Sequence, residues 1–437
     1  MPVTTSRKKT VYIAMSADIL HPGHLNIIRE GQKLGEVVIG LLTDRAIASY
    51  KRVPLMDYEQ RLEMISNIKG ITRVVAQTTL DYRPNLHELR PDYVVHGSDW
   101  QQGIQSQARQ QVIDTLAEWG GLLIEPDYTE GISSTTLQAR LKASGVSPTT
   151  RLKQLQRLIS AKDLVRVMEA HNGLSALIVE NIQSQVASAK PEQFDAIWVS
   201  SLTDSLAKGK PDTEVVDRTS RLATINQILE VTTKPIIVDG DTGGHIVHFV
   251  DTVRSLERLG VSAVVIEDKT GLKQNSFHSR PSEHQQAAIP FFAAKIKAGL
   301  AARVDDDFMV IARIESLVVG AGQTDALNRA QAYLDAGASA IMIHSKDSSA
   351  ADIKEFAASY DKLKPKKPLM LVPTSYNKLY ETELSELGAS IVVYANQLLR
   401  AAYPAMERAA LSILENHRAY EVEELCTPTT DLLNMFA

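Results

Sequence analysis

At 437 residues the chain is long for one domain and suits two or three. Its 44% hydrophobic and 23% charged content and its formal net charge of −5 are ordinary for a globular enzyme and give no sign of binding to nucleic acid or membranes. No apolar run approaches the roughly 20 residues that span a bilayer, and the first residues lack the apolar core of a signal peptide. Cys426 is the only cysteine, which excludes an intrachain disulfide. We therefore expect a cytoplasmic enzyme.

The first part of the chain alternates strand-like and helix-like stretches. Short apolar runs predict strands at residues 11–15, 37–42, 93–96 and 122–124. Helices are expected after His24 and from Tyr58 to Ile68. Such alternation predicts a parallel sheet covered by helices.

A small, polar segment rich in glycine, proline and serine follows at residues 143–150 and predicts a linker. We therefore expect a first domain at residues 1–143, a linker at 144–153 and a second domain at 154–437. The end of the second domain, from Gln397 to Ala437, is helical in pattern.

The second domain repeats a strand and helix pattern. Its apolar runs predict eight strands, at residues 176–179, 196–199, 235–238, 263–266, 308–311, 340–343, 369–372 and 391–394. Eight such units in about 250 residues match a (β/α)₈ barrel. A doubly wound sheet is the alternative, because periodicity does not show closure.

Polar side chains follow most of these runs, where an α/β enzyme places its chemistry. In chain order they are Glu180, Ser200, Ser201, Asp239, Asp241, Glu267, Asp268, Arg313, Glu315, His344, Thr374, Ser375 and Asn396. A structural explanation suits Glu180, Thr374 and Asn396 equally well, since polar residues also mark the start of loops.

Three of these acids, Asp239, Asp241 and Glu267, are hard oxygen donors at the ends of neighbouring predicted strands. A few carboxylates with several waters is the usual way to hold Mg²⁺ beside a phosphorylated substrate. Arg313 offers a planar fork for a carboxylate or phosphoryl group. The alternative for Arg313 and His344 is a structural ion pair or hydrogen bond, but their position on the same face favours a site.

The stretch from Glu267 to Ser276 reads Glu-Asp-Lys, five residues, then Asn-Ser. This spacing resembles the signature of the phosphoenolpyruvate mutase/isocitrate lyase superfamily, and the resemblance covers about residues 155–410. It implies a Mg²⁺ site at Asp239, Asp241 and Glu267. It implies a substrate pocket formed by Trp198, Ser200, Ser201, Leu202, Asp239 and Arg313, and catalytic roles for Asp212, Lys273, Asn275, Arg313 and His344.

The reaction implied is the isomerisation of phosphoenolpyruvate to phosphonopyruvate. Phosphoryl transfer through a loose transition state needs positioning and charge stabilisation, and the loop from Thr270 to Arg280 is expected to close and exclude water. Asn275 either stabilises the migrating group or accepts it transiently. Phosphonopyruvate hydrolase, which has a similar loop and the same metal site, is the alternative. The Lys-Lys-Cys-Gly-His motif of the lyases is missing here.

The N-terminal part carries His21-Pro22-Gly23-His24 at the start of a predicted helix, where a phosphate is favoured. With the segment 129–136 it resembles the HxGH cytidylyltransferases over about residues 9–142, although Tyr128 and Ser98 depart from the usual arginine and acid. His21 and His24 would stabilise charge on the α-phosphate. The resemblance implies a nucleotide site formed by Asp18, His21, Gly23, His24, Lys51, Gly97, Asp99, Ile132, Ser133, Ser134 and Thr135.

Fusion of these two domains is found in phosphonate biosynthesis. It implies that CTP donates CMP to a small phosphonate, such as 2-hydroxyethylphosphonate or 2-aminoethylphosphonate. The alternative is a vestigial or sensory nucleotide-binding domain. In relatives of the barrel a C-terminal helix packs onto a second subunit, which implies a homo-oligomer.

Overall fold

The computed structural model describes residues 7–101, 106–126, 147–184, 191–271, 273 and 285–435. The chain divides into two compact units. The first comprises residues 1–150, 156–163 and 184–192, and the second comprises residues 151–155, 164–183 and 193–437. Helix α7 (Pro148–Ala161) takes up the second part of the predicted linker. The exact domain bounds stay a prediction.

The first unit is built on a five-stranded sheet in the order β3-β2-β1-β4-β5, and every neighbouring pair is parallel. Its strands are β1 (Thr10–Met15), β2 (Glu36–Leu42), β3 (Ile71–Gln77), β4 (Tyr93–Val95) and β5 (Leu122–Ile124). Its helices are α1 (Pro22–Leu34), α2 (Asp44–Ala48), α3 (Tyr58–Ser66), α4 (Arg83–Leu89) and α5 (Ser106–Ala117), with a short 3₁₀ turn, η1, at Ser98–Gln101.

Successive side chains of β1 point to opposite faces of the sheet and belong to two separate hydrophobic clusters. Tyr12 and Ala14 belong to one cluster, and Val11 and Ile13 belong to the other. The sheet is therefore covered on both faces, as the alternation of strands and helices predicted.

The second unit is a closed barrel of eight parallel strands. The strands are β6 (Val165–Glu169), β7 (Ala196–Val199), β8 (Ile236–Asp239), β9 (Ala263–Glu267), β10 (Met309–Ile314), β11 (Ala340–Ile343), β12 (Leu369–Leu371) and β13 (Ala389–Tyr394). This confirms the barrel and excludes the doubly wound alternative.

The prediction of the first barrel strand was wrong. Residues 176–179 lie in helix α8 (Gly173–Asn181), which Asn172 caps, and the strand is β6 instead. Arg166 interrupts the apolar pattern of β6 and forms an ion pair with Glu381. Glu180 consequently lies in α8, where it accepts hydrogen bonds from Thr232 and Thr233. Its role is structural.

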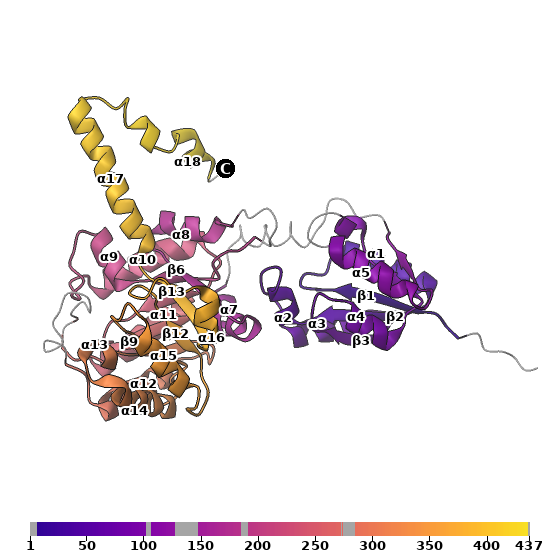
Figure 1. The fold of residues 1–437 in the computed structure, drawn as a ribbon, viewed down its shortest axis with the longest axis horizontal. Coiled ribbons are helices and arrows are strands. Elements are labelled where there is room, and N and C mark those ends of the chain that lie inside the picture. The colour runs from indigo at the N-terminus through magenta and orange to yellow at the C-terminus, as the bar shows by residue number, and fades with distance from the viewer. Residues whose placement is uncertain are drawn as a thin grey trace, which may run out of the picture. The chain divides into compact units, whose positions relative to one another are not determined.

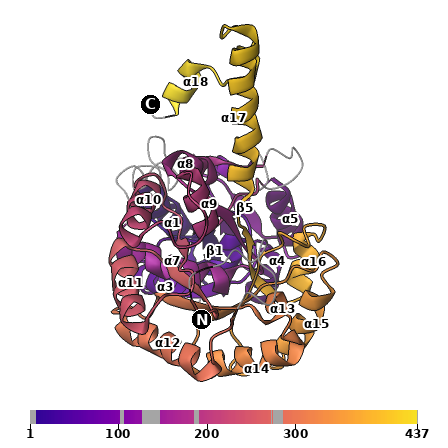
Figure 2. The ribbon, with the colours of Figure 1, turned by 90° about the vertical axis from the view of Figure 1, so that its left-hand side faces the viewer.

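Helices surround the barrel in a ring, of which α11, α12, α14 and α15 form the lower part of Figure 2. Besides α8, the helices of this unit are α9 (Ser201–Ala207), α10 (Arg218–Val231), α11 (Ile246–Leu259), α12 (Ile289–Ala302), α13 (Ser316–Val319), α14 (Gly322–Asp335), α15 (Ala351–Tyr360), α16 (Glu381–Glu386), α17 (Gln397–Asn416), η4 (Glu423–Leu425) and α18 (Thr429–Asn434).

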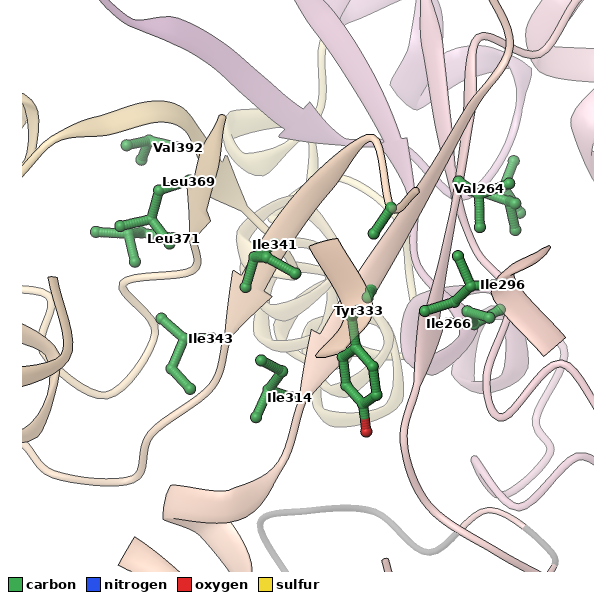
Figure 3. Close-up of a cluster of buried hydrophobic side chains, with 14 of the residues drawn as sticks. Val264, Ile266, Ile296, Ile314, Tyr333, Ile341, Ile343, Leu369, Leu371 and Val392 are labelled. Carbon is green, nitrogen blue, oxygen red and sulfur yellow. The ribbon is translucent and has the colours of Figure 1, made fainter. Parts of the chain in front are cut away.

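The main hydrophobic core fills the layer between strands and helices. Val264 and Ile266 of β9 share this core with Ile296 of α12, and Figure 3 shows the three side chains together. Because side chains alternate along a strand, Val265 and Glu267 point to the barrel interior. This alternation directs the polar strand ends into one place.

Helix α17 leaves the barrel and extends away from it (Figure 1). It has no buried residue along its length. Glu169, at the end of β6, accepts a hydrogen bond from the backbone N–H of Leu398 at the start of α17. In the parts of the chain that the structure describes, no helix is both long and apolar enough to cross a membrane.

Candidate active site at the carboxyl end of the barrel

The predicted metal and substrate residues come together at the carboxyl ends of β8 to β11. Asp239 ends β8, Glu267 ends β9, and Arg313 lies opposite Glu267 in the register of β9 and β10. His344 directly follows β11. All four side chains are at least nine-tenths buried, so their charges interact in a region where water screens weakly.

The turn Asp239-Gly240-Asp241 is fixed by backbone contacts with β9. Gly240 donates its N–H to Val265 O at 2.7 Å, and a Cβ at Gly240 would lie 2.8 Å from Val264 Cγ2. Asp241 has a φ of +53°, a strained value for a residue with a side chain, and its carbonyl accepts the N–H of Glu267 at 2.8 Å. The strand pairing therefore holds this turn against the next strand.

Lys273 places its ammonium among three of the acids. Its Nζ lies 2.6 Å from Asp241 Oδ1, 3.1 Å from Asp212 Oδ1 and 3.5 Å from Asp239 Oδ2. Ser201 also contacts this group and donates a hydrogen bond to Asp239 Oδ2 at 2.6 Å. These contacts confine Lys273 and the three carboxylates to one cluster.

Arg221, in the first turn of α10, is a second cation beside the same acids. Its Nη1 lies 2.7 Å from Asp241 Oδ2 and donates to the carbonyl of Asp239 at 3.1 Å. Burial would raise the pKa of Asp239, but Lys273, Arg313 and Arg221 hold it well below its usual range. The carboxylate is therefore ionised at neutral pH.

A second group of buried charges lies beside the first. Arg313 Nε donates to Glu315 Oε1 at 2.6 Å, and Arg313 Nη2 lies 3.4 Å from Glu267 Oε2. Lys269 Nζ lies 3.1 Å from Glu315 Oε2 and 3.6 Å from Glu267 Oε1. His344 Nδ1 lies 3.0 Å from Glu315 Oε1 and 2.9 Å from Arg313 Nη2.

Glu267 connects the two groups and is electrostatically less satisfied than the other acids. Burial raises the pKa of Glu267 to about 7, and neither of its carboxylate oxygens accepts a hydrogen bond from the residues that the structure describes. Its distances to Arg313 and Lys269, 3.4 and 3.6 Å, are also longer than the distances from Glu315 to the same two residues. Such a buried, incompletely paired carboxylate can accept a further cation.

The acids fit a hard divalent cation once Lys273 moves. Among the described residues no group of three His, Cys, Asp or Glu side chains is arranged to bind a metal as it stands. Lys273 accounts for this, because its ammonium occupies the centre of Asp212, Asp239 and Asp241. The donors present are the carboxylate oxygens that Mg²⁺ prefers.

Residues predicted to bind substrate lie at the end of β7 and the start of α9, where Ser201 contacts Asp239 of this cluster. Trp198 of β7 is 2% exposed, and its indole Nε1 has no hydrogen-bond partner among the described residues. Ser200 caps helix α9, Ser201 contacts Asp239, and Leu202 is half-buried in the first turn of α9. Asn275 lies outside the described residues.

In the first unit, His21 and His24 lie together at the start of α1. His21 caps the helix and accepts the N–H of Gly23, and the two imidazole rings are 4.1 Å apart between centroids. Burial, His21 and Lys51 lower the pKa of His24 to about 4. Lys51 donates to Ser16 Oγ at 3.1 Å, and burial lowers its pKa. The histidines are thus neutral at pH 7 beside a helix N-terminus that favours anions.

The other predicted nucleotide residues are placed less directly. Asp18 is buried and accepts the N–H of Leu55 at 2.7 Å, which gives it a structural contact. Gly97 precedes η1, and Asp99 lies within η1. Ile132, Ser133, Ser134 and Thr135 fall outside the described residues. Trp100, which directly follows Asp99, stacks on His96 at 3.9 Å between ring centroids.

Three charged residues of the barrel site received no role from the sequence. Arg221 has no local signal, because it lies in the first turn of a helix and not at the end of a predicted strand. Lys269 and Glu315 did carry a local signal in the sequence, since both follow the apolar runs of predicted strands and lie within short charged runs. Their contacts with Glu267 and Arg313 depend on the register of β9 and β10.

Two family models match the chain. Residues 155–414 match the family described as phosphoenolpyruvate phosphomutase, and residues 16–140 match the cytidylyltransferase-like family.

Relatives and solved structures match the barrel portion. A phosphoenolpyruvate phosphomutase of Tetrahymena pyriformis is 36% identical, covering 63% of this chain and 88% of the relative. A phosphonopyruvate hydrolase of Variovorax sp. is 34% identical, covering 65% and 94%. The crystal structure of phosphoenolpyruvate phosphomutase from Streptomyces platensis subsp. rosaceus is similar with a TM-score of 0.58 and 35% identity, covering 64% of this chain and 93% of that one. The protein is therefore an enzyme that joins an isomerase-type barrel to a nucleotidyltransferase-like domain.

The position of Lys273 yields a prediction for cation binding. Lys273→Met keeps the length of the side chain and removes the ammonium that Mg²⁺ must displace. Two unit charges 4 Å apart interact by about 4 kcal/mol at an effective dielectric near 20, and about 1.4 kcal/mol corresponds to tenfold in affinity. We expect Mg²⁺ to bind Lys273→Met about tenfold more tightly or better, as measured by isothermal titration calorimetry without substrate.

Lys234→Met is the matched control, because Lys234 is a buried lysine that donates to Phe194 O and precedes β8, at the opposite end of that strand from Asp239. Its affinity for Mg²⁺ should equal that of the wild type. Unchanged or weaker Mg²⁺ binding in Lys273→Met would show that Lys273 does not compete with the cation.

Proposed function

Since the chain belongs to the phosphoenolpyruvate phosphomutase family, we propose that its barrel interconverts phosphoenolpyruvate and phosphonopyruvate. In the forward direction the bond between phosphorus and the enol oxygen breaks, and a bond between phosphorus and C3 forms. Atoms and charge balance within one molecule. The observation that carries the proposal is the cluster of Asp239, Asp241 and Glu267 on adjacent strands, with Arg313 and His344 beside it.

The cationic side chains suit a highly charged substrate. Arg313 is buried, and Glu315 and Glu267 raise its pKa against the effect of burial, so its guanidinium stays charged. It would bind a carboxylate or phosphoryl group through its planar fork. Lys273 would exchange its contacts with the acids for a contact with the migrating phosphoryl group. Trp198 Nε1 is a buried donor without a partner among the described residues, and it would donate to the substrate.

We propose Mg²⁺ as the cofactor, held by Asp239, Asp241 and Glu267. When bound, it supplies positive charge that stabilises the enolate oxygens of the substrate. In its buried position Glu267 accepts no hydrogen bond from any described residue, which supports its use as a ligand. A phosphonopyruvate hydrolase of known structure was crystallised with oxalate and Mg²⁺ and is 33% identical to this chain.

The alternative for the barrel is hydrolysis of phosphonopyruvate, and the 34% identity with the Variovorax hydrolase supports it. The two reactions differ in whether water reaches the phosphoryl group. The cytidylyltransferase-like domain at residues 16–140 favours the mutase. That domain would use a phosphonate derived from phosphonopyruvate, whereas a hydrolase would destroy the phosphonopyruvate from which such a phosphonate is made.

The mutase proposal is tested by ³¹P NMR of the protein with phosphonopyruvate and Mg²⁺. We expect phosphoenolpyruvate as the product. Asp239→Asn removes a charge at the centre of the site, so its turnover should fall by about 10³-fold. Glu180→Gln alters a buried carboxylate in α8 and should leave turnover unchanged. Inorganic phosphate as the product would identify a hydrolase, and no turnover of phosphonopyruvate would contradict both assignments.

We further propose that the first unit transfers CMP from CTP to a small phosphonate. A phosphonate oxygen attacks the α-phosphorus of CTP, and pyrophosphate leaves. The N-terminus of α1, with His21, His24 and the nearby Lys51, suits the triphosphate. The acceptor we expect is 2-hydroxyethylphosphonate or 2-aminoethylphosphonate. A sensory role without turnover is the alternative.

Release of pyrophosphate tests this second activity. The protein is incubated with Mg²⁺, each phosphonate and either CTP or another nucleoside triphosphate. We expect release with CTP, and a loss of about 10²- to 10³-fold in His24→Ala. His87→Ala is the control, because His87 lies in α4 and is half exposed. If no acceptor led to release of pyrophosphate in a protein that shows mutase activity, the domain would be vestigial or sensory.

We also propose that the protein is a homo-oligomer in which α17 packs onto another subunit. Large apolar side chains on α17 are more than half exposed, among them Tyr403, Met406 and Leu414. Burying them would be favourable. Sedimentation velocity should show a species heavier than the 48.1 kDa chain, and a monomer at micromolar concentration would contradict the proposal. Cytoplasmic location stays a prediction from the sequence.

A further inference from the structure

We propose that Glu315 is a positioning residue that orients both Arg313 and His344 toward the substrate and sets the tautomer of His344. The inference rests on the proposed substrate contacts of Arg313 and His344. Glu315 follows β10 and is 0% exposed. It is the one residue described here whose carboxylate contacts both of these side chains.

The first step concerns Arg313. Glu315 Oε1 accepts from Arg313 Nε at 2.6 Å, a short charge-assisted bond. Nε lies on the stem side of the guanidinium, so this bond fixes the plane of the group while its Nη2 lies near Glu267 and His344. Without Glu315, the guanidinium would keep its longer contact with Glu267, at 3.4 Å.

The second step concerns the carboxylate itself. Glu315 Oε2 lies 3.1 Å from Lys269 Nζ, and the backbone N–H of Glu315 donates to Asp268 Oδ1 at 3.0 Å. Asp268 is in turn held by Arg329 and by the hydroxyl of Tyr333. Glu315 is therefore fixed by Lys269 and Asp268, to neither of which we assign a substrate contact, as a residue that orients others needs to be.

The third step concerns the proton on His344. Nδ1 lies between two groups, the guanidinium Nη2 of Arg313 at 2.9 Å and Glu315 Oε1 at 3.0 Å. If Nδ1 accepted from Arg313, its lone pair would also face the carboxylate oxygen, which is repulsive. If Nδ1 carries the proton, it donates to Glu315. The carboxylate therefore selects the Nδ1–H tautomer, as carboxylates do for histidines at metal sites.

The consequence lies at the other ring nitrogen. With the proton on Nδ1, Nε2 carries the lone pair and can take up a proton when a phosphorylated substrate arrives. The imidazolium then donates from Nε2 while Nδ1 stays bonded to Glu315. Glu315 thereby keeps the ring in one orientation in both protonation states.

Glu315→Gln tests the inference, because it keeps the size of the side chain and removes the charge. The amide no longer repels a lone pair on Nδ1, so His344 should change to the Nε2–H tautomer and accept from Arg313. Two-bond ¹⁵N–¹H NMR of protein labelled in histidine reports the tautomer without any turnover. The signal of His344 is identified by its loss in His344→Gln.

We expect kcat for phosphonopyruvate to fall about 10- to 100-fold in Glu315→Gln, which is typical when a group that orients a functional side chain is removed. Glu180→Gln is the matched control, because it alters a buried carboxylate that accepts hydroxyl hydrogen bonds in the same barrel. It should change neither kcat nor the His344 signal.

The wild-type spectrum is decisive even if Glu315→Gln does not fold. An Nε2–H tautomer in the wild type would overturn the inference, and so would Nδ1–H in both proteins. A wild type with the Nδ1–H tautomer but without mutase turnover would contradict the proposed function and leave the role of Glu315 toward His344 in place. Normal kcat in a folded Glu315→Gln would overturn the positioning role.

Discussion

The arrangement of the barrel depends on the burial of five carboxylates at one end of it. They surround Lys273 and Arg313 and are Asp212, Asp239, Asp241, Glu267 and Glu315, all at most 7% exposed, while the buried Asp268 pairs separately with Arg329. Isolated buried carboxylates would be neutralised by protonation. Four cationic side chains lie among the five and oppose this, least completely at Glu267, namely Arg221, Lys269, Lys273 and Arg313. One negative charge remains in excess, which suits the binding of a cation.

This balance divides the site into two parts with Glu267 between them. Lys273 and Arg221 offset two of the three aspartate charges in the first part. Arg313, Lys269 and Glu315 form the second part, which orients groups toward a substrate. Lys273 lies several residues beyond β9 and outside any helix or strand, whereas Arg221 lies in α10, Arg313 lies in β10 and Lys269 forms a β-bridge with Gln286. It is thus the cation best able to exchange places with a metal ion.

The sequence predicted most of the fold because the pattern of buried strands is local. Apolar runs identified seven of the eight barrel strands, and the polar groups after them identified Asp239, Glu267, Arg313 and His344. The first strand, β6, was not predicted because Arg166 interrupts its apolar run. The apolar residues of α8 form a short run that is typical of a strand, and they were assigned as the strand instead. Strand β3 was not predicted either, because charged and polar residues interrupt it.

The contacts within the site were beyond the sequence because they depend on pairing between distant segments. Arg221 reaches Asp241 from a helix, and no local pattern marks it. Glu315 was recognised as a strand-end acid, but its contact with His344 requires β10 and β11 to be adjacent and in register. The same limit applies to Lys273, whose three aspartate partners come from two separate segments, Asp212 and the turn that holds Asp239 and Asp241.

The central claim is that the acids around Lys273 form a cation site that the lysine occupies until the metal arrives. Anomalous X-ray diffraction from crystals of the full chain grown with Mn²⁺ locates the bound cation directly. The account predicts one strong peak beside Asp239, Asp241 and Glu267, with Lys273 Nζ moved away from Asp241. A peak elsewhere in the barrel, or Lys273 still among the aspartates at saturating Mn²⁺, would contradict it.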